Sequence, residues 1–287
     1  MFLRVIVVTE HLVSNSVDKD LESARQRIAS LPVLPVLDPR LPQVLAQTNV
    51  DLQYQQLREL LRVDPALAAR VLKVANSAFY GSRTITSIDR SLTVLGAVAV
   101  AGIAMVARFD ATSVPAGRAS QALLHLRRHS LLTAVAAKRL AARSGDPLWD
   151  PESAFVLGLL HDLGWLVPPQ IAGELPLERE SVPATEPDGP GEHSVLSAAL
   201  FAHWQLPVQF IDAVRDHHGP QAGAALGSAL LAVAEQCGVH AGDEFGPHLP
   251  PPDLASALAL FALSDAELAE LSAECAAEAA AIDGLVH

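Results

Sequence analysis

The stretch AFVLGLLHDLG, residues 154–164, holds an adjacent histidine and aspartate, His161 and Asp162, in a segment that is otherwise apolar. An N-cap aspartate and a proline at 150–151 precede it, so the sequence predicts a helix over 152–166. A helix that is apolar on nearly all sides is typical of the middle of a bundle. Because a buried imidazole and carboxylate are costly when unpaired, either a metal ion or a hydrogen-bond network within the core must compensate them.

Helical periodicity continues on both sides of this stretch. Half of the residues are hydrophobic but only 5% are aromatic, and a core of alanine, leucine and valine favours packed helices over sheets. We expect helices over 18–28, 53–62, 64–80, 88–108, 120–143, 152–166, 193–204, 207–217 and 223–239. A capping box from Ser264 to Glu267 starts a C-terminal helix, which we expect to dock onto the domain. The fold prediction is therefore all-α.

Proline-rich segments interrupt the helical pattern at three places. LPVLPVLDPRLP, residues 31–42, holds four prolines and predicts an extended strip rather than a helix. Residues 168–190 hold six prolines and five acidic residues, which indicates a long acidic loop. A third break lies at 242–252, so residues 241–287 are interpreted as a C-terminal linker and helix. Residues 1–30 form an N-terminal segment to which the sequence assigns no role.

Charge and composition exclude several classes of protein. Lys and Arg number 20 against 32 Asp and Glu, and the resulting net charge of −12 disfavours binding to a nucleic-acid backbone. Only two cysteines are present, which fits a reducing cytoplasm better than a disulfide scaffold. The apolar run at 91–107 is at the lower limit for a membrane span and contains two glycines, so we interpret it as a core helix and expect no membrane association.

Further candidate metal ligands follow the same chain order as the predicted helices. Together with the central pair they make a set of seven: His129, His161, Asp162, His193, His217, His218 and Glu235. Helical proteins build metal sites from such donors on several helices of one bundle, and mixed histidine and carboxylate sets suit divalent iron, manganese or zinc. Any one of these histidines taken alone is more often a surface residue or a satisfied core residue than a metal ligand.

Several motifs occur in an order that is similar to one known family. They are LPVLP near 31, DPALAARVLKVANSAFYG at 64–81, SLTVLG at 91–96, HS at 129–130, AFVLGLLHDLG at 154–164 and HWQLPVQFIDAVRDHHGP at 203–220. Over residues 31–240 the chain resembles the HDOD family, the signalling branch of the HD superfamily of metal-dependent phosphohydrolases.

This resemblance implies an HD-superfamily-like helical bundle with an additional N-terminal helical subdomain. The N-terminal half would span 31–110, and the HD-like half would span 115–240 with the acidic loop inside it. The family is associated with bacterial signal transduction through protein partners, usually without demonstrated hydrolase activity. The histidines of the set and Asp162 match the ligand positions of the HD layout.

The sequence departs from the catalytic HD enzymes at three positions. The cyclic-di-GMP phosphodiesterase branch, HD-GYP, has a lysine three residues after the HD aspartate, where this chain has Trp165. It also has a GYP signature soon after the paired histidines, where this chain reads GPQAG at 219–223. Glu235 replaces the last metal-binding aspartate, which puts a second metal position in doubt.

Two hypotheses follow from these residues. The first is a regulatory signalling protein that acts through protein–protein interaction and binds a divalent metal without efficient catalysis. The second is a metal-dependent phosphohydrolase acting on a nucleotide or a cyclic dinucleotide. The net negative charge of the protein would repel such an anionic substrate, and the basic pair at 127–128 would offset this repulsion locally. A DNA-reading role for the helix-turn-helix-like text at 53–78 is disfavoured by the net charge.

Overall fold

The protein is described here by a computed structural model. It describes residues 21–29, 38, 40–77, 80, 84–113, 119–167, 192–218, 226–243, 245 and 254–286. All regular structure within these ranges is helical, which confirms the all-α prediction. Residues 21–29 are helical as expected, and the later elements are α2 (Arg40–Ala46), α3 (Val50–Val63), α4 (Pro65–Ala75), α5 (Ile88–Leu95), α6 (Ala97–Ser113), α7 (Ala119–Ser144), α8 (Pro151–Leu160), the 3-10 helix η2 (Leu163–Leu166), α10 (Glu192–His203), α11 (Val208–Arg215), α12 (Leu226–His240), α13 (Leu254–Leu260) and α14 (Asp265–Val286).

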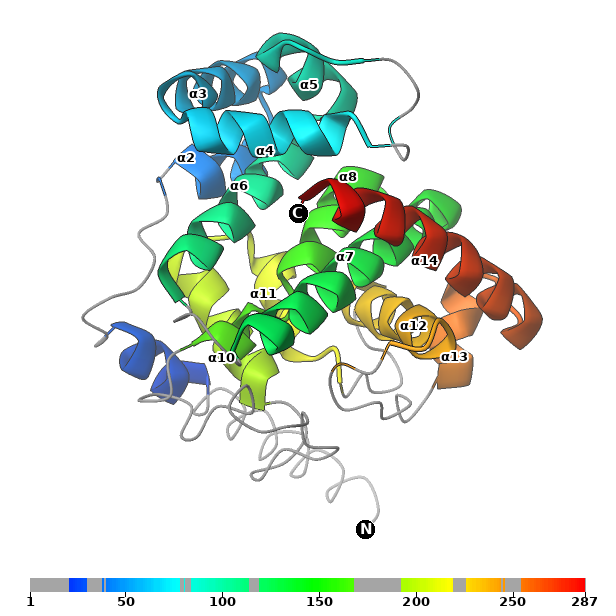
Figure 1. The fold of residues 1–287 in the computed structure, drawn as a ribbon. Helices are drawn as coiled ribbons and strands as arrows, with labels where there is room; N and C mark the ends of the chain where they lie inside the picture. The colour runs from blue at the N-terminus through cyan, green and yellow to red at the C-terminus, as the bar shows by residue number, and fades with distance from the viewer. Residues whose placement is uncertain are drawn as a thin grey trace.

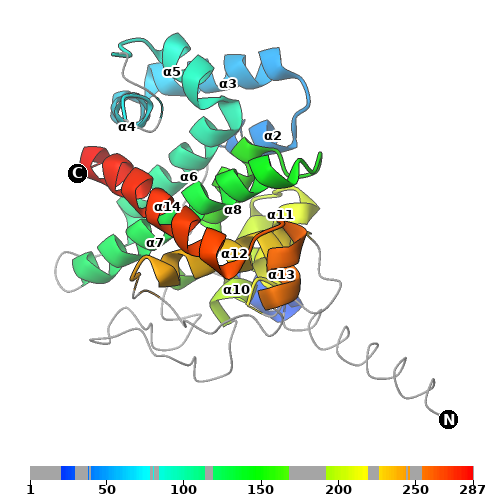
Figure 2. The same ribbon diagram turned by 90° about the vertical axis from the view of Figure 1, so that its right-hand side faces the viewer.

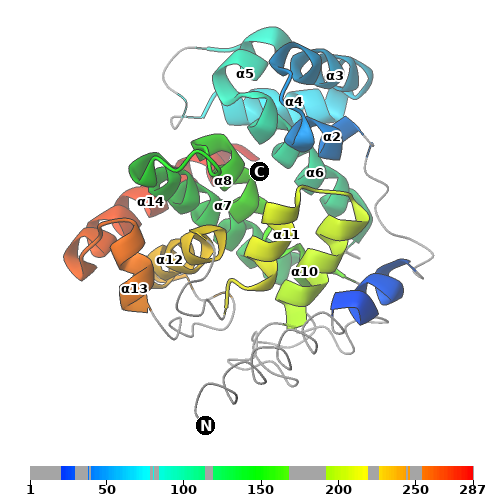
Figure 3. The same ribbon diagram turned by 180° about the vertical axis from the view of Figure 1, so that it is seen from behind.

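The helices are arranged in two groups joined by α6. Helices α2 to α5 lie together at one end of the molecule, and α6 runs from them into the second group (Figure 1). In that group α7 and α8 pack against each other at the centre, with α10 and α11 on one side and α12 and α13 on the other (Figure 3). The division into halves at 31–110 and 115–240 stays a prediction.

Two N-terminal helices have a different boundary from the predicted one: α2 at its start and α4 at its end. Helix α2 begins inside the proline-rich segment that we predicted to be extended, because Asp38 caps it and Pro42 lies in its first turn, where a proline is tolerated. Helix α4 starts at the predicted aspartate–proline pair but ends at Ala75, short of 80. Its end is fixed by Asn76, whose amide binds the carbonyls of Leu72 and Ile85.

The predicted helix over 88–108 is two helices. Gly96 has φ +80°, a left-handed conformation that glycine adopts without strain, and α5 and α6 meet there at 107°. Among the described residues no single helix has the length and apolar character of a membrane span. Among these residues, only α5 and the first part of α6 have that length and apolar character, and only when they are counted together across this bend.

The helix that carries the central pair ends earlier than expected. Helix α8 stops at Leu160, His161 and Asp162 form a turn, and the chain continues as η2. In a continuous helix two successive side chains would diverge by about 100°. His161 keeps α-helical dihedral angles, whereas Asp162 departs from them with φ −103° and ψ 15°. Both side chains reach the same site, with Asp162 Oδ1 3.4 Å from His161 Nε2.

Glycine at position 158 allows the central helices α7 and α8 to pack closely. A Cβ atom built on Gly158 would lie 2.7 Å from the Cα atom of Ala134 on α7, and backbone atoms cannot move aside as a flexible side chain can. We expect Gly158→Ala to lower the free energy of unfolding by about 1–3 kcal/mol, the usual range for overpacking. Urea denaturation measures this. An unchanged midpoint would contradict the close packing of these two helices.

Helix α14 is docked on α7 and α12, with its end near α4, as Figure 2 shows. The predicted capping box is present, with Ser264 and Glu267 bonded to each other. On the exposed side Arg139 of α7 pairs with Glu274 and Glu278. The buried side packs apolar residues such as Ile282 into the core.

Several sequence predictions lie outside the described residues. They are the acidic loop at 168–190, the strip at 31–37, the first twenty residues, the GPQAG segment at 219–223 and most of the break at 242–252. The short helix α13, which the sequence did not predict, follows that break.

Candidate metal centre

The structure brings all seven predicted site residues together. His129 comes from the middle of α7, the central pair from the turn after α8, His193 from the start of α10, the histidine pair 217–218 from the turn after α11, and Glu235 from α12. His217 was expected at the end of a helix over 207–217, with His218 directly after it. Because α11 ends at Arg215, both of their side chains can instead reach the same cluster.

A second glycine sets the position of His193. A Cβ atom at Gly164 would lie 2.0 Å from the carbonyl oxygen of His193, so only glycine allows η2 to approach α10 this closely. The Gly164 amide also donates to the Ser197 hydroxyl at 2.7 Å. The glycine of the quoted stretch therefore fixes the approach of α10 to the central turn.

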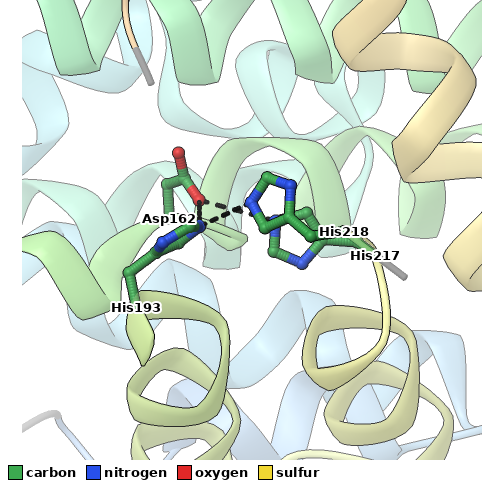
Figure 4. Close-up of side chains that lie close together, drawn as sticks. All are labelled: Asp162, His193, His217 and His218. Atoms are coloured by element: carbon green, nitrogen blue, oxygen red, sulfur yellow. Dashed lines mark hydrogen bonds and ion pairs between the residues drawn. The ribbon is translucent and has the colours of Figure 1, made fainter. Parts of the chain in front are cut away.

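Asp162 lies at the centre of the cluster. Its Oδ1 is 3.4 Å from His161 Nε2 and 3.3 Å from His193 Nε2, and its Oδ2 is 3.3 Å from His129 Nε2. Figure 4 shows this carboxylate facing His193 and the paired histidines. Its side chain is only 4% exposed, so water offers it little compensation.

Two of the histidines are held by backbone carbonyls of their own helices. His161 Nδ1 donates to Gly158 O at 2.7 Å, and His217 Nδ1 donates to Val214 O at 2.5 Å. A carbonyl oxygen only accepts hydrogen bonds, so each Nδ1 carries a proton. In the neutral ring the lone pair is then on Nε2, which faces the carboxylates.

The inward-facing atoms form an arrangement of electron donors. Glu235 Oε1 lies 3.3 Å from His161 Nε2 and 3.2 Å from His217 Nε2. Glu235 Oε1, His217 Nε2 and Asp162 Oδ1 are buried and have no hydrogen-bond partner among the described residues. His193 Nε2 and His218 Nε2 share a hydrogen bond at 2.7 Å, but the three unpartnered atoms need either protons or a cation between them.

Six of the seven residues fall into two overlapping groups of four, in each of which the ligand atoms lie within 4.8 Å of one another, and His129 belongs to neither group. The groups are Asp162 with His193, His217 and His218, and Asp162 with His161, His217 and Glu235. They share Asp162 and His217. Nitrogen and carboxylate donors in these numbers fit a divalent transition metal.

The acidic members of the cluster are ionised. Burial alone would raise the pKa of Asp162, but the neighbouring His161 and His193 rings outweigh burial and hold that pKa well below its usual range. Burial likewise opposes the charge of Glu235, and the rings of His218 and His217 lower the pKa of this carboxyl. Two negative charges therefore lie in the core beside the histidines.

The histidines divide into two kinds. Burial lowers the pKa of His129, but hydrogen bonds to Asp162 and Asp243 outweigh it and raise the pKa to about 10. Burial also opposes protonation of His217, where the charge of Glu235 raises the pKa to about 10. Burial and the charge of His217 lower the pKa of His218 to about 3. Without a metal, bound protons would balance the carboxylates, and a metal ion must displace them.

Comparison with known proteins identifies the family. The HDOD domain matches residues 31–220, about two thirds of the chain. The chain belongs to the HDOD family. This confirms the resemblance seen in the sequence. The resemblance was assigned to residues 31–240, twenty residues beyond the end of the family match.

Solved structures share the fold of this chain, and a curated relative is similar to it in sequence. An HDOD domain protein of unknown function from Geobacter sulfurreducens superposes with a TM-score of 0.67 at 23% identity, covering 94% of this chain and 98% of that one. A proposed metal-dependent phosphohydrolase from Shewanella amazonensis SB2B gives 0.62 at 18% identity, covering 97% and 99%. An uncharacterized protein of Treponema pallidum (strain Nichols) is 28% identical over 75% of this chain, which spans only 43% of that relative.

Sequence analysis missed one residue beside the seven-residue cluster. Asp243, just after α12, lies with its Oδ2 2.7 Å from His129 Nδ1. It stands inside the proline-rich break at 242–252, a segment without helical periodicity, and gave no motif signal. Its spacing from Glu235 is eight residues, about two helical turns, but the helix ends before it.

Trp165, at the position where the sequence resemblance to HD-GYP would place a lysine, lies against the seven-residue cluster. Its ring stacks on His193 with centroids 4.4 Å apart and 15° between the planes. It is 3% exposed, and its Nε1 has no hydrogen-bond partner among the described residues. An uncharged indole thus stands where the phosphodiesterases have a cation.

Proposed function

We propose that this HDOD protein is a signalling protein that binds divalent metal at the seven-residue centre and acts through a protein partner, without efficient turnover of a phosphodiester. The observation that carries the proposal is the convergence of buried lone pairs and carboxylate oxygens in two groups that share Asp162 and His217. A divalent ion would satisfy those donors better than protons do, since one ion can accept electron pairs from four ligands.

The signalling part of the proposal rests on the family and its relatives. HDOD is the matched family, and a structurally similar protein from Marinobacter aquaeolei VT8 is described as a proposed signal transduction protein. That protein has a TM-score of 0.67 at 21% identity over 95% of this chain and 66% of its own length. We place this chain in the reducing cytoplasm, where free buried cysteines such as Cys237 and Cys275 are stable.

Weak turnover is expected because charge stabilisation is missing at the phosphate. A bound metal supplies Lewis acidity and a more acidic water. Hydrolysis also needs donors or cations at the equatorial and leaving oxygens. Trp165 supplies no positive charge there. Of the basic pair on α7, Arg128 is exposed and Arg127 partly buried, and both already have interaction partners.

A phosphohydrolase is the second candidate, and one observation favours it. Two four-ligand groups that share a carboxylate and a histidine could hold two ions close together, and paired ions serve many enzymes that cleave phosphate esters. The substrate would then be a nucleotide or a cyclic dinucleotide. Both candidates have the same metal centre. They differ in whether the bound metal supports efficient hydrolysis of a phosphate ester.

One paired experiment separates these candidates. Metal content is measured by mass spectrometry on wild type and on His161→Ala, and both are assayed with excess manganese, iron or zinc on a cyclic dinucleotide and on a generic phosphodiester. We expect metal in wild type, less in His161→Ala, and turnover well below about 1 s⁻¹ in both. Wild-type turnover at about 1 s⁻¹ or faster that His161→Ala abolishes would establish the phosphohydrolase instead.

A further inference from the structure

Asp243 is held in a defined orientation beside the metal centre. Its Oδ2 accepts a hydrogen bond from His129 Nδ1 at 2.7 Å, while its Oδ1 accepts one from the Phe245 backbone amide at 3.1 Å. Its own amide donates to the carbonyl of Gly238 at 3.0 Å. Both carboxylate oxygens are thus engaged. Neither Asp243 nor His129 belongs to a four-ligand group, but His129 Nε2 lies beside the ligand atoms of His161 and Asp162.

His129 differs from His161 and His217 in the hydrogen-bond partner of its outer ring nitrogen, Nδ1, which points away from the cluster. His161 and His217 each donate to a carbonyl three residues earlier in the chain, so their own helices orient them. His129 lies within α7, where the helix uses its carbonyls internally, and its outer nitrogen meets a side chain 114 residues away. Its orientation therefore depends on the segment that follows α12.

The contact with Asp243 determines which nitrogen of His129 faces the metal centre. Because Oδ2 accepts from Nδ1–H, the remaining lone pair of the neutral ring is on Nε2. That atom lies 3.1 Å from His161 Nε2 and 3.3 Å from Asp162 Oδ2. A carboxylate on the far side of a ligating histidine fixes its tautomer and makes it a stronger electron donor.

We infer that Asp243 is a positioning residue that orients His129 and strengthens it as a metal ligand. This inference rests on the proposed metal-binding function. Phe245 supports it, since its ring lies against His129 with centroids 5.4 Å apart and is 2% exposed. Gly242, with φ +79°, provides the turn that brings the segment back toward α7.

The test is a double-mutant cycle on the full chain, read out as metal affinity. Mn²⁺ and Zn²⁺ are titrated calorimetrically into chelator-treated wild type, Asp243→Ala, His129→Ala and the double variant. We expect Asp243→Ala to weaken binding by about 10–100-fold, the range for outer carboxylates of metal-ligating histidines. In the His129→Ala background the same substitution should have no further effect, because its only route to the metal is then absent.

Two further variants separate positioning from general destabilisation. Asp243→Asn keeps an acceptor oxygen for Nδ1–H but removes the charge, so its affinity should lie between wild type and Asp243→Ala. Asp146→Ala is the matched control, because Asp146 accepts from the Leu148 amide in a similar turn and contacts none of the seven site residues among the described contacts. Its affinity should equal that of wild type.

Each outcome bears on a different claim. Equal affinities for wild type and Asp243→Ala would overturn the positioning role while leaving the metal centre intact. The same loss in the presence and absence of His129 would also overturn it, since Asp243 would then act by another route. Wild type that binds neither ion would overturn the proposed function, and the positioning role with it.

Discussion

Asp162→Ala is expected to abolish metal binding altogether. Asp162 is the carboxylate common to both four-ligand groups, and its Oδ1 is buried without a hydrogen-bond partner among the described residues. Removing it leaves three ligands in each group and takes away a negative charge that balances the bound ion. No other single carboxylate substitution in the cluster should affect both groups.

The same substitution should also destabilise the protein without metal. The carboxylate faces rings with raised pKa values, His129 and His217, and its loss leaves positive charge buried without its counter-charge. Removing one partner of a buried charge pair typically costs about 3–5 kcal/mol. Asp162→Asn keeps the volume of the side chain and isolates the contribution of the charge.

Thermal unfolding with and without manganese measures both effects. Free metal at a thousand times the dissociation constant should stabilise wild type by about 4 kcal/mol, because it binds the folded state only. The melting temperature of Asp162→Ala should not respond to metal. Asp212→Ala, which removes a half-exposed carboxylate on α11, should behave as wild type.

The measurement also decides between the two explanations that the sequence left open for the buried pair. If the core were balanced by hydrogen bonds and protons alone, Asp162→Ala would lose stability, but wild type would not respond to metal either. A metal-dependent rise in wild type that persists in Asp162→Ala would place the ion elsewhere and contradict the proposed centre.

The fold class could be predicted from the sequence because helix periodicity and capping are local signals. The aspartate–proline starts of α4 and α8 and the capping box of α14 are where the sequence places them. Helix ends were less predictable. Gly96 divides one apolar run into α5 and α6, and only the left-handed conformation of that glycine reveals the division.

The seven candidate ligands were found because they are polar residues in apolar helices or match a family motif. Asp243 was not found, because its role depends on the return of the chain from α12 to α7, a contact between residues 114 positions apart. The close approach of η2 to α10 at Gly164 is of the same kind. Such features arise from packing and leave no periodic pattern in the sequence.

A pair of single substitutions should show how many ions the centre holds. His193 and His218 belong to one four-ligand group only, and Glu235 belongs only to the other. If the two groups hold two ions, His193→Ala and Glu235→Gln should each reduce the bound metal from two ions per chain to one. The ion that remains differs between the variants, because each loses a ligand from a different group.

The resemblance to HD enzymes put the second ion in doubt, because this chain has glutamate at 235 where those enzymes have a metal-binding aspartate. In the structure the longer side chain still brings Oε1 within 3.3 Å of His161 Nε2 and 3.2 Å of His217 Nε2. The extra methylene therefore does not withdraw the carboxylate from the cluster. Glu235→Asp would shorten the side chain and should weaken only the group that contains His161.

Metal per chain, measured by mass spectrometry after equilibration with excess manganese or zinc, distinguishes the arrangements. With a single ion held by ligands from both groups, wild type would bind one ion, and both variants would weaken the same binding event. Two ions in wild type and one in each variant require separate positions joined through Asp162 and His217. A wild-type value of one would restrict the chemistry to a single ion, which favours the signalling proposal over two-ion hydrolysis.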